Sequence, residues 1–226
     1  CAELRGSMPD YMRRAFNVPM PGFTAPKLKW VARHEPDIFP RVAKVLLPKD
    51  VLRWKLTGAF VSDMSDSAGT LWMDIPARRW DDDLLAAGGM RRDQMPELVE
   101  GSEVSAHLHP DLAAAWGLSG RRIPVAGGGG DNASSAVGIG AAAHGDGFLS
   151  LGTSGVLFST TDRPVTLPER TLHGFCHALP DRWHGMVVVL SAAFAVEWAA
   201  TLTGKGGDIA GFIASAEGFA ADPVRL

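Results

Sequence analysis

The sequence predicts an α/β protein whose first part is mainly helical and whose second part is rich in short strands. Up to about residue 122, apolar residues recur at helical spacing between turns marked by proline and glycine. Beyond that point, short segments of β-branched and aromatic residues are bounded by turn residues, which is the pattern of strands. The chain has 226 residues, 46% hydrophobic and 21% charged, enough for one large or two modest domains. The change of pattern places a domain boundary between residues 124 and 147.

Four segments of the first part have the pattern of helices. In the segment KDVLRWKLTG, Asp50 is expected to cap the helix and Gly58 to end it. Val51 and Trp54 would then lie on its apolar face, and most tryptophans of the chain are expected to pack in the core. In the segment RWDDDLLAAGG, acidic residues in the first turn interact favourably with the helix dipole, and two glycines end the helix. The four segments are TAPKLKWVARHEP, KDVLRWKLTG, RWDDDLLAAGG and PDLAAAWGLSG.

The second part is predicted to contain five strands followed by a helix. The strands are short, bounded by turns, and rich in branched or aromatic residues. The helix is expected to be capped by Ser191 and to end at Gly204. The predicted strands lie in RIPVAG, GFLSLG, GVLFSTT, HGFCHAL and RWHGMVVVL, and the helix lies in SAAFAVEWAATLTG.

A glycine-rich turn stands in PVAGGGGDNASSAVGIG, residues 124–140. Glycine lets a ligand approach the backbone closely and tolerates positive φ. Asp131 follows this turn beyond the end of a predicted strand, where open α/β sheets bind ligands, so it is a candidate general base or metal-organising carboxylate. The alternative is a flexible turn whose aspartate only caps the next helix. A dinucleotide site is less favoured, because the glycines do not have the spacing G-x-G-x-x-G.

A second turn, in FLSLGTSGVLF at residues 148–158, offers backbone N–H groups and two hydroxyls. These groups are suited to holding phosphate oxygens, and the alternative is a plain hairpin. Two glycine-hydroxyl turns close together in sequence, one of them carrying an acid, favour phosphate chemistry. Neither the P-loop pattern nor the protein-kinase motifs occur. The candidate phosphate-binding residues are Gly152, Thr153, Ser154 and Gly155.

Two further groups of polar residues are interpreted as structural. Asp63 and Asp66 lie among serines and a glycine, where a hydrogen-bonded turn is the favoured interpretation over a ligand site. The other group lies on two predicted strands. On the first strand His173 and His177 would face one side and Cys176 the other, so the group does not converge as zinc ligands must. No metal ligands are therefore assigned. This second group is His173, Cys176, His177 and His184.

Composition and charge argue against several classes of partner. A formal net charge of −3 gives no reason to expect a nucleic acid. No apolar run approaches the roughly 18 residues of a membrane span, and the N-terminus lacks the pattern of a signal peptide. Two cysteines fit a reducing compartment, so the cytoplasm is the expected location. The chain does not begin with methionine and is expected to be a piece of a longer protein.

These motifs, taken in order, resemble those of the FGGY carbohydrate kinases, and within the family they are most similar to kinases of D-xylulose. The resemblance implies two actin/hexokinase-like α/β domains around a cleft. Residues 1–140 would be the C-terminal part of the sugar-binding domain, and residues 141–226 the first part of the nucleotide-binding domain. The matching segments cover nearly the whole chain: GFTAPKLKWVARHEP, VLLPKDVLRWKLTG, SDMSDSAGTLWMD, RDQMPELVEGSE, PVAGGGGDNASSAVGIG, LSLGTSGVLF and FCHALPDRWH.

The resemblance also implies roles for the candidate residues. Asp131 is similar to the family's catalytic base, which also contacts the sugar, and Asn132 is similar to a residue that binds sugar hydroxyls. The turn at 152–155 is similar to the family's second phosphate loop, on the nucleotide side. The implied reaction is the phosphorylation of D-xylulose to D-xylulose 5-phosphate by ATP with Mg²⁺.

Some alternatives stay open. The substrate would be another sugar or polyol, such as ribulose or glycerol, or the chain would be a non-catalytic actin-like ligand-binding module. A homodimer is also left open. Because the family's first phosphate loop, its N-terminal sugar-contacting segment and its C-terminal adenosine motif have no counterpart here, the chain alone is expected to be inactive.

Overall fold

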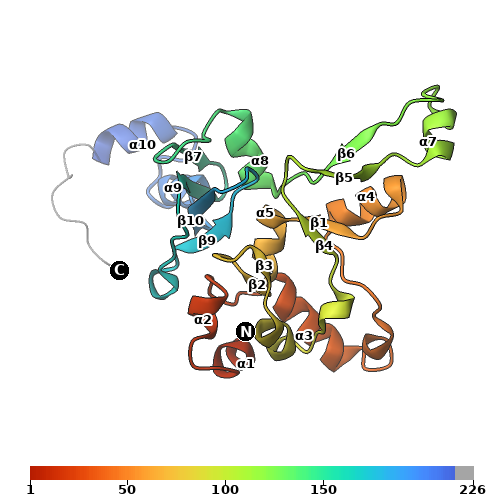
Figure 1. Ribbon diagram of the computed structural model, residues 1–226. Helices are drawn as coiled ribbons and strands as arrows, with labels where there is room; N and C mark the ends of the chain where they lie inside the picture. Colours follow the sequence, from red (N-terminus) through yellow and green to blue (C-terminus); the bar gives the residue numbers. More distant parts are fainter. Residues whose placement is uncertain (217–226) are drawn as a thin grey trace. The chain divides into compact units, whose positions relative to one another are not determined.

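The structure, a computed structural model, describes residues 1–216 and has the mixed α/β content that the sequence predicts (Figure 1). The chain divides into two compact units. The first comprises Cys1–Gly147 and Phe158–Met186, and the second comprises Phe148–Leu157 and Val187–Leu226. The predicted domain boundary at residue 140 stays a prediction, and residues 217–226 of the second predicted domain lie outside the described residues.

The helices occur where the sequence pattern predicts them. The four predicted helical segments of the first part form α3, α4, α6 and α7, and the predicted helix of the second part forms α9. No helix of residues 1–216 is both long and apolar enough to cross a bilayer. The α-helices are α1 (Ala2–Gly6), α2 (Tyr11–Arg14), α3 (Thr24–His34), α4 (Pro48–Thr57), α5 (Met64–Ser67), α6 (Asp82–Ala87), α7 (Pro110–Ala115), α8 (Asp131–Gly138), α9 (Ala193–Leu202) and α10 (Ile209–Ala216).

Short 3₁₀ helices and strands complete the fold. All five predicted strands are confirmed, as β6 to β10. The 3₁₀ helices are η1 (Phe39–Arg41), η2 (Ala68–Thr70), η3 (Arg92–Gln94) and η4 (Pro168–Arg170). The strands are β1 (Val61–Asp63), β2 (Met73–Asp74), β3 (Arg79–Trp80), β4 (Glu97–Val99), β5 (Val104–His107), β6 (Pro124–Ala126), β7 (Gly147–Leu151), β8 (Gly155–Thr161), β9 (His173–Cys176) and β10 (Trp183–Val189).

The strands pair into three small sheets and one larger sheet. β1 pairs with β4 in parallel, β2 with β3 and β5 with β6 in antiparallel fashion, and four strands follow the order β7-β8-β10-β9. In the β9–β10 pair, Phe175 lies opposite His184. The strands β1 to β5 are not predicted by the sequence. They have two to four residues each, and their segments lack the run of branched or aromatic residues between turns that marks β6 to β10.

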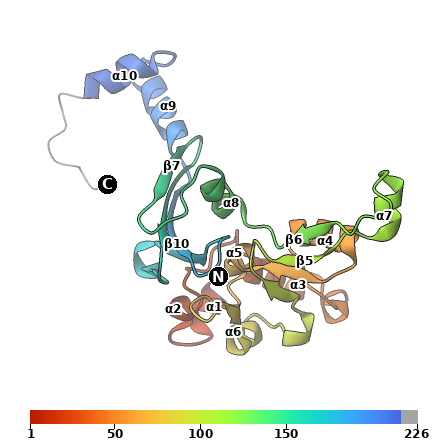
Figure 2. The same ribbon diagram turned by 45° about the horizontal axis from the view of Figure 1, so that its top comes forward.

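The core of the first unit gathers side chains from both ends of that unit's sequence. Trp72 is a fully buried member of this core, and the strand β9 contributes Phe175 and Cys176. The β5–β6 ribbon leads away to α7 at its tip (Figures 1 and 2), and β6 leads back into the unit. The larger buried apolar side chains of this core are Leu4, Tyr11, Leu71, Trp72, Met73, Ile75, Trp80, Leu84, Leu85, Met90, Met95 and Phe175.

The structure corrects two expectations about helix ends. Leu47 is the N-cap of α4, and Asp50 is the third residue of the helix, where its carboxylate accepts a hydrogen bond from the Leu47 N–H at 3.2 Å. In α9 the N-cap is Ala192 without a side-chain bond, not Ser191. Gly58 ends α4 in the left-handed conformation at φ 79°, as glycine allows without penalty.

The buried face of α4 is charged, which corrects the expected apolar face. Asp50 and Arg53 are 0% and 5% exposed, whereas Val51 and Trp54 are 37% and 39% exposed. Several other tryptophans also lie at the surface instead of in the core. Trp72 and Trp80 are buried, but Trp30, Trp116 and Trp198 are exposed.

Candidate functional site

The glycine-rich turn connects β6 to α8 and places Asp131 as the first residue of that helix. Gly130 is the N-cap, so Asp131 does not cap the helix. Its Oδ1 instead accepts hydrogen bonds from the Asn132 backbone N–H at 2.8 Å and from the Asn132 side-chain amide at 3.1 Å. The Asp131 side chain is exposed, and a carboxylate at the start of a helix is favoured by the helix dipole.

The turn has no room for side chains at two of its positions. A Cβ atom on Gly127 would collide with the carbonyl oxygen of Glu100, and one on Gly129 would lie 2.7 Å from the Ser134 hydroxyl. Gly128 has a φ of +79°, which residues with a side chain rarely adopt. The glycines are therefore required for a compact turn packed against its surroundings.

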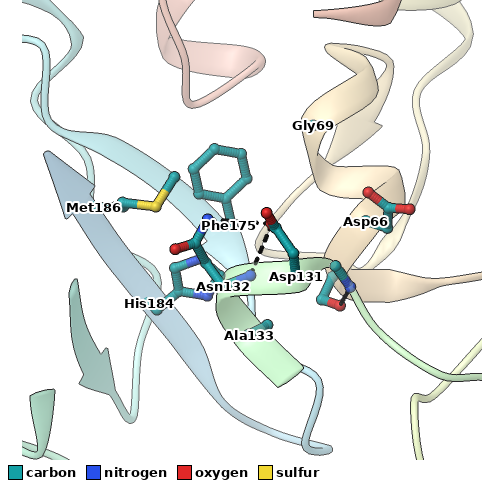
Figure 3. Close-up of a pocket in the computed structure, with 10 residues that line it drawn as sticks. Asp66, Gly69, Asp131, Asn132, Ala133, Phe175, His184 and Met186 are labelled. Carbon is teal, nitrogen blue, oxygen red and sulfur yellow. Dashed lines mark hydrogen bonds between the residues drawn. The ribbon is translucent and has the colours of Figure 1, made fainter. Parts of the chain in front are cut away.

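Asp131 and Asn132 border a cavity of about 90 Å³ in the first unit. Figure 3 shows Asp131 and Asn132 at the start of α8, with Asp66 on one side and residues of β9 and β10 on the other. The cavity therefore combines two carboxylates, an amide and an apolar wall. Its lining includes Asp66, Asp131, Asn132, Phe175, His184 and Met186.

The carboxylate of Asp66 belongs to a cluster of charged side chains, of which Asp50 and Asp63 are fully buried. The Lys49 Nζ is 2.5 Å from Asp63 Oδ1, 2.7 Å from Asp50 Oδ1 and 3.2 Å from Asp66 Oδ2. Burial by itself lowers the pKa of Lys49, but the negative charges of Asp63, Asp50 and Asp66 outweigh it and raise the pKa above its ordinary value. The ammonium group therefore stays charged at neutral pH.

Burial acts in the opposite sense on Asp66. It raises the pKa of this carboxyl group, and the attraction of Lys49 offsets only part of the rise. Asp63 fixes the helix that carries Asp66, because its Oδ2 accepts hydrogen bonds from the backbone N–H groups of Ser65 at 2.8 Å and Asp66 at 3.1 Å. The favoured sequence interpretation of a turn at these aspartates is thus replaced by the capped helix α5.

One wall of the cavity is aromatic and includes an uncharged histidine. His184 stacks on Phe158 at a centroid distance of 4.3 Å and on Phe175 at 5.2 Å. Burial, with a smaller effect of His177, lowers the pKa of His184 to about 3. Its Nδ1 has no hydrogen-bond partner among the described residues. At neutral pH this wall is therefore uncharged, and it is apolar except for the nitrogen atoms of the imidazole ring.

The other histidines of this region also serve the interior. The imidazole of His173 is hydrogen-bonded through Nδ1 to the Asn17 side chain at 2.8 Å, and burial lowers its pKa. His177 is buried edge-on against Phe158, and burial is the main cause that lowers its pKa. Within residues 1–216, no three His, Cys, Asp or Glu side chains are arranged to hold a metal ion.

The predicted phosphate-binding turn, residues 152–155, belongs to the second unit and joins β7 to β8. Its backbone is held by the start of α9, because the Ala192 N–H donates to the Thr153 carbonyl oxygen at 2.8 Å. The Ser154 hydroxyl donates to the Leu190 carbonyl oxygen at 3.0 Å. Thr153 and Ser154 are exposed, so the turn is ordered by its own unit and open to solvent.

The structure brings some candidate residues together and adds others. Asp131 and Asn132 share one cavity in the first unit, whereas the turn at 152–155 lies in the second. Sequence reasoning missed Lys49 at this site and set Asp66 and His184 aside as structural residues. The signal for the charged cluster was present, since Lys49 stands beside an acid at a helix start, but only folding reveals which distant acids it meets.

Comparison with known proteins gives the family. Residues 3–138 match the FGGY family of carbohydrate kinases, N-terminal domain. The chain is 53% identical over 204 residues to the xylulose kinase of Escherichia coli strain K12, which covers 90% of this chain and 42% of that protein. It is 55% identical over 188 residues to the xylulose kinase of Klebsiella pneumoniae, covering 83% and 38%. The chain thus spans less than half the length of these relatives.

Solved structures agree with the sequence relatives. A xyloylose kinase from Brucella ovis superposes with a TM-score of 0.86 at 55% identity, covering 90% of this chain and 42% of that one. The xylulose kinase from Rhodospirillum rubrum superposes with a TM-score of 0.84 at 25% identity, covering 99% and 46%. The α/β fold is therefore the actin/hexokinase-like fold expected from the motifs, here as a fragment. The chain belongs to the FGGY family of carbohydrate kinases.

Proposed function

We propose that this chain is part of a kinase that transfers the γ-phosphoryl group of ATP to D-xylulose and forms D-xylulose 5-phosphate. The named activity of the relatives at 53% and 55% identity supports this substrate. The observation that carries the proposal is the position of Asp131, an exposed carboxylate on a close-packed glycine turn that borders a cavity.

In this proposal Asp131 is the general base. The 5-hydroxyl of the sugar is a poor nucleophile, and phosphoryl transfer needs alignment and charge stabilisation more than covalent help. The Asp131 carboxylate accepts the hydroxyl proton while the sugar oxygen bonds to the γ-phosphorus and ADP leaves with the electrons of the broken P–O bond. Asn132, whose amide lies beside this carboxylate, binds sugar hydroxyls.

The turn at 152–155 is proposed to bind the phosphates of ATP, which enters as its magnesium complex. The exposed Thr153 hydroxyl and backbone N–H groups of this turn are the proposed donors for phosphate oxygens. The Ser154 hydroxyl would exchange its bond with the Leu190 carbonyl oxygen for a bond with a phosphate oxygen. Mg²⁺ neutralises phosphate charge and is usually held through one or two carboxylates and water. The carboxylate of Asp66, which borders the same cavity as Asp131, fits such a donor set.

The wider assignments are proposals of the same kind. Residues 1–140 form part of the sugar-binding domain, which the family match over residues 3–138 supports, and residues 141–226 begin the nucleotide-binding domain. Two free cysteines support a cytoplasmic location. That the protein forms a homodimer is likewise a proposal.

The replacement Asp131→Asn in the full-length kinase tests this function. We expect kcat to fall by about 10²- to 10⁴-fold, because the amide cannot accept the proton, while nucleotide affinity stays nearly unchanged. A coupled assay of ADP release measures kcat, and nucleotide titration measures the dissociation constant.

Asp111→Asn is the matched control, because Asp111 is also an exposed aspartate in the first turn of a helix. It should leave kcat unchanged. An Asp131→Asn enzyme with the wild-type kcat would remove Asp131 from its role. The same assay over a panel of sugars and polyols tests the substrate, and a strong preference for ribulose or glycerol would overturn the choice of D-xylulose.

A further inference from the structure

The glycine turn before Asp131 is fastened at both ends by side chains distant in sequence. At its beginning, the guanidinium group of Arg53 donates a hydrogen bond to the carbonyl oxygen of Gly127. At its end, the Gly130 N–H donates to the hydroxyl oxygen of Ser65 at 2.9 Å. Both donors and acceptors of these bonds lie in the first unit. The position of the turn is therefore set by α4 and α5 as well as by its own backbone.

Both attachments lead back to one ammonium group. The Ser65 hydroxyl donates to Asp63 Oδ2 at 2.5 Å, and Arg53 Nη1 lies 3.0 Å from Asp50 Oδ1. Lys49 Nζ joins the two carboxylates, at 2.5 Å from Asp63 and 2.7 Å from Asp50. We call Lys49, Asp50, Arg53, Asp63 and Ser65 the turn clamp.

Burying the charged groups of the turn clamp costs free energy. Asp50 and Asp63 are 0% exposed, and removing one partner of a buried ion pair leaves a carboxylate uncompensated. Buried ion pairs often stabilise a fold no more than apolar residues of the same volume would. What charged, short hydrogen bonds add is a defined geometry. A turn of four glycines has more conformational freedom than a turn of the same length made of other residues. External hydrogen bonds are therefore needed to give it one defined geometry.

The carboxylate of Asp131 depends on that geometry. Its side chain is exposed, and its hydrogen bonds are with the adjacent Asn132. These local bonds orient the carboxylate relative to the start of α8 but do not fix where that start lies. The start of α8 is fastened to Ser65 by the hydrogen bond that the N–H of Gly130, one residue before Asp131, donates to the Ser65 hydroxyl oxygen.

We propose that Ser65, held by the Lys49–Asp63 ion pair, is a positioning residue for Asp131 that fixes the last peptide of the glycine turn in place for proton acceptance. This inference rests on the proposed function of Asp131. Ser65 itself takes no proton in the reaction. It acts through the Gly130 N–H.

The test compares Ser65→Ala with Ser67→Ala in the full-length kinase. Both serines are buried residues of α5, but the Ser67 hydroxyl donates to the Ser62 hydroxyl and not to the turn. Ser65→Ala is expected to speed hydrogen–deuterium exchange of a peptide covering residues 127–131 by about tenfold, the equivalent of one lost hydrogen bond. It is expected to lower kcat by about 10- to 100-fold with KM for ATP changed less than about twofold, because misplacement affects the reacting geometry.

Ser67→Ala is expected to leave exchange at residues 127–131 and kcat as in the wild type, even if it lowers the melting temperature. Equal effects of the two replacements on kcat would overturn the proposal, and so would unchanged exchange or unchanged kcat in Ser65→Ala. If Ser65→Ala does not fold, Ser65→Cys replaces it, because a thiol of similar size is a weak acceptor.

Exchange is measured without substrate, which separates this inference from the proposed function. A wild-type protein with no kinase activity on any sugar would refute the proposed function. The exchange comparison would then decide alone whether Ser65 holds the turn, and a wild-type exchange rate in Ser65→Ala would refute that as well.

Discussion

The imidazole of His184 links a single buried residue to the stability of the whole protein. The residue is 4% exposed and its ring stacks on two phenylalanines, so the folded protein keeps the imidazole uncharged. Burial lowers its pKa to about 3, whereas an unfolded chain protonates it near the ordinary value of 6.5. Between these values the unfolded state binds the extra proton, so this contribution to stability is complete above pH 6.5 and is lost as the pH falls.

His184→Phe should therefore make the protein less sensitive to acid. Phenylalanine fills a similar volume without a nitrogen that can be protonated. We expect the free energy of unfolding to fall less steeply between pH 6.5 and 4.5, with the difference in slope approaching about 1.4 kcal/mol per pH unit for one histidine. Urea unfolding of the full-length protein at several pH values measures these slopes.

The matched control for this prediction is His34→Phe. His34 also stacks on an aromatic ring, that of Trp30 at 4.6 Å, but it is exposed. Its replacement should leave the slope as in the wild type. Parallel pH dependences for wild type and His184→Phe would show that His184 is protonated in the folded state at the same pH as in the unfolded chain.

Single residues also show where sequence reasoning stops. Asp131 and the glycines before it could be found from sequence, because a run of glycine followed by an acid is a local signal. The joint role of Lys49, Asp63 and Ser65 could not, because these residue types are common at protein surfaces and only the fold places them beside one another. An amphipathic pattern predicts that α4 buries its apolar face, and the ion pairs of Asp50 and Arg53 reverse that choice.

At the scale of elements, the glycine turn and the helix after it use glycine for different reasons. A Cβ atom on Gly127 would collide with the Glu100 carbonyl oxygen and lie 3.0 Å from a methyl group of Val99. Gly138, the last residue of α8, has nothing within 4 Å of the place its Cβ atom would occupy. The first glycine is needed for packing, and the second is not.

Alanine at these two positions should change stability in opposite directions. Gly127→Ala is expected to destabilise the protein by about 1–3 kcal/mol, because rigid backbone must move. Gly138→Ala is expected to stabilise it by about 0.4–1 kcal/mol, because alanine restricts the unfolded chain. Chemical denaturation of both variants provides the comparison. A Gly127→Ala variant as stable as the wild type would mean that the turn is not packed as described.

Elements differ in how far the sequence predicts them. The strands β8 and β10 each have seven residues of marked composition, so their pattern stands out. The pair β1 and β4 has three residues on each side. Arg53 of the turn clamp fastens β1 to α4 through a bond to the Val61 carbonyl oxygen at 2.6 Å. Contacts of this kind join separate elements of the fold, so no local sequence pattern predicts the strands that they hold.

At the scale of the whole molecule, the second unit exposes large apolar side chains in regular patterns. Leu149 and Leu151 are two apart on β7, at 62% and 69% exposed, so they lie on one face of the strand. Phe194, Trp198 and Leu202 are four apart on α9, at 55%, 59% and 69% exposed, so they lie on one face of the helix. Ordered apolar faces of this kind are features of surfaces that pack against further protein.

The length of the relatives agrees with this interpretation, since the chain covers 42% of the Escherichia coli xylulose kinase. We therefore expect the 226-residue chain, expressed alone, to bind the dye ANS strongly and to release no ADP from ATP in the presence of D-xylulose. The full-length kinase, as the control, should bind little dye and turn over, because we expect its remaining sequence to cover these faces and to complete the site. Dye fluorescence and the coupled ADP assay on both proteins measure the two properties. Sustained turnover by the isolated chain would mean that the residues described here suffice for catalysis, and weak dye binding would mean that the apolar faces are already covered.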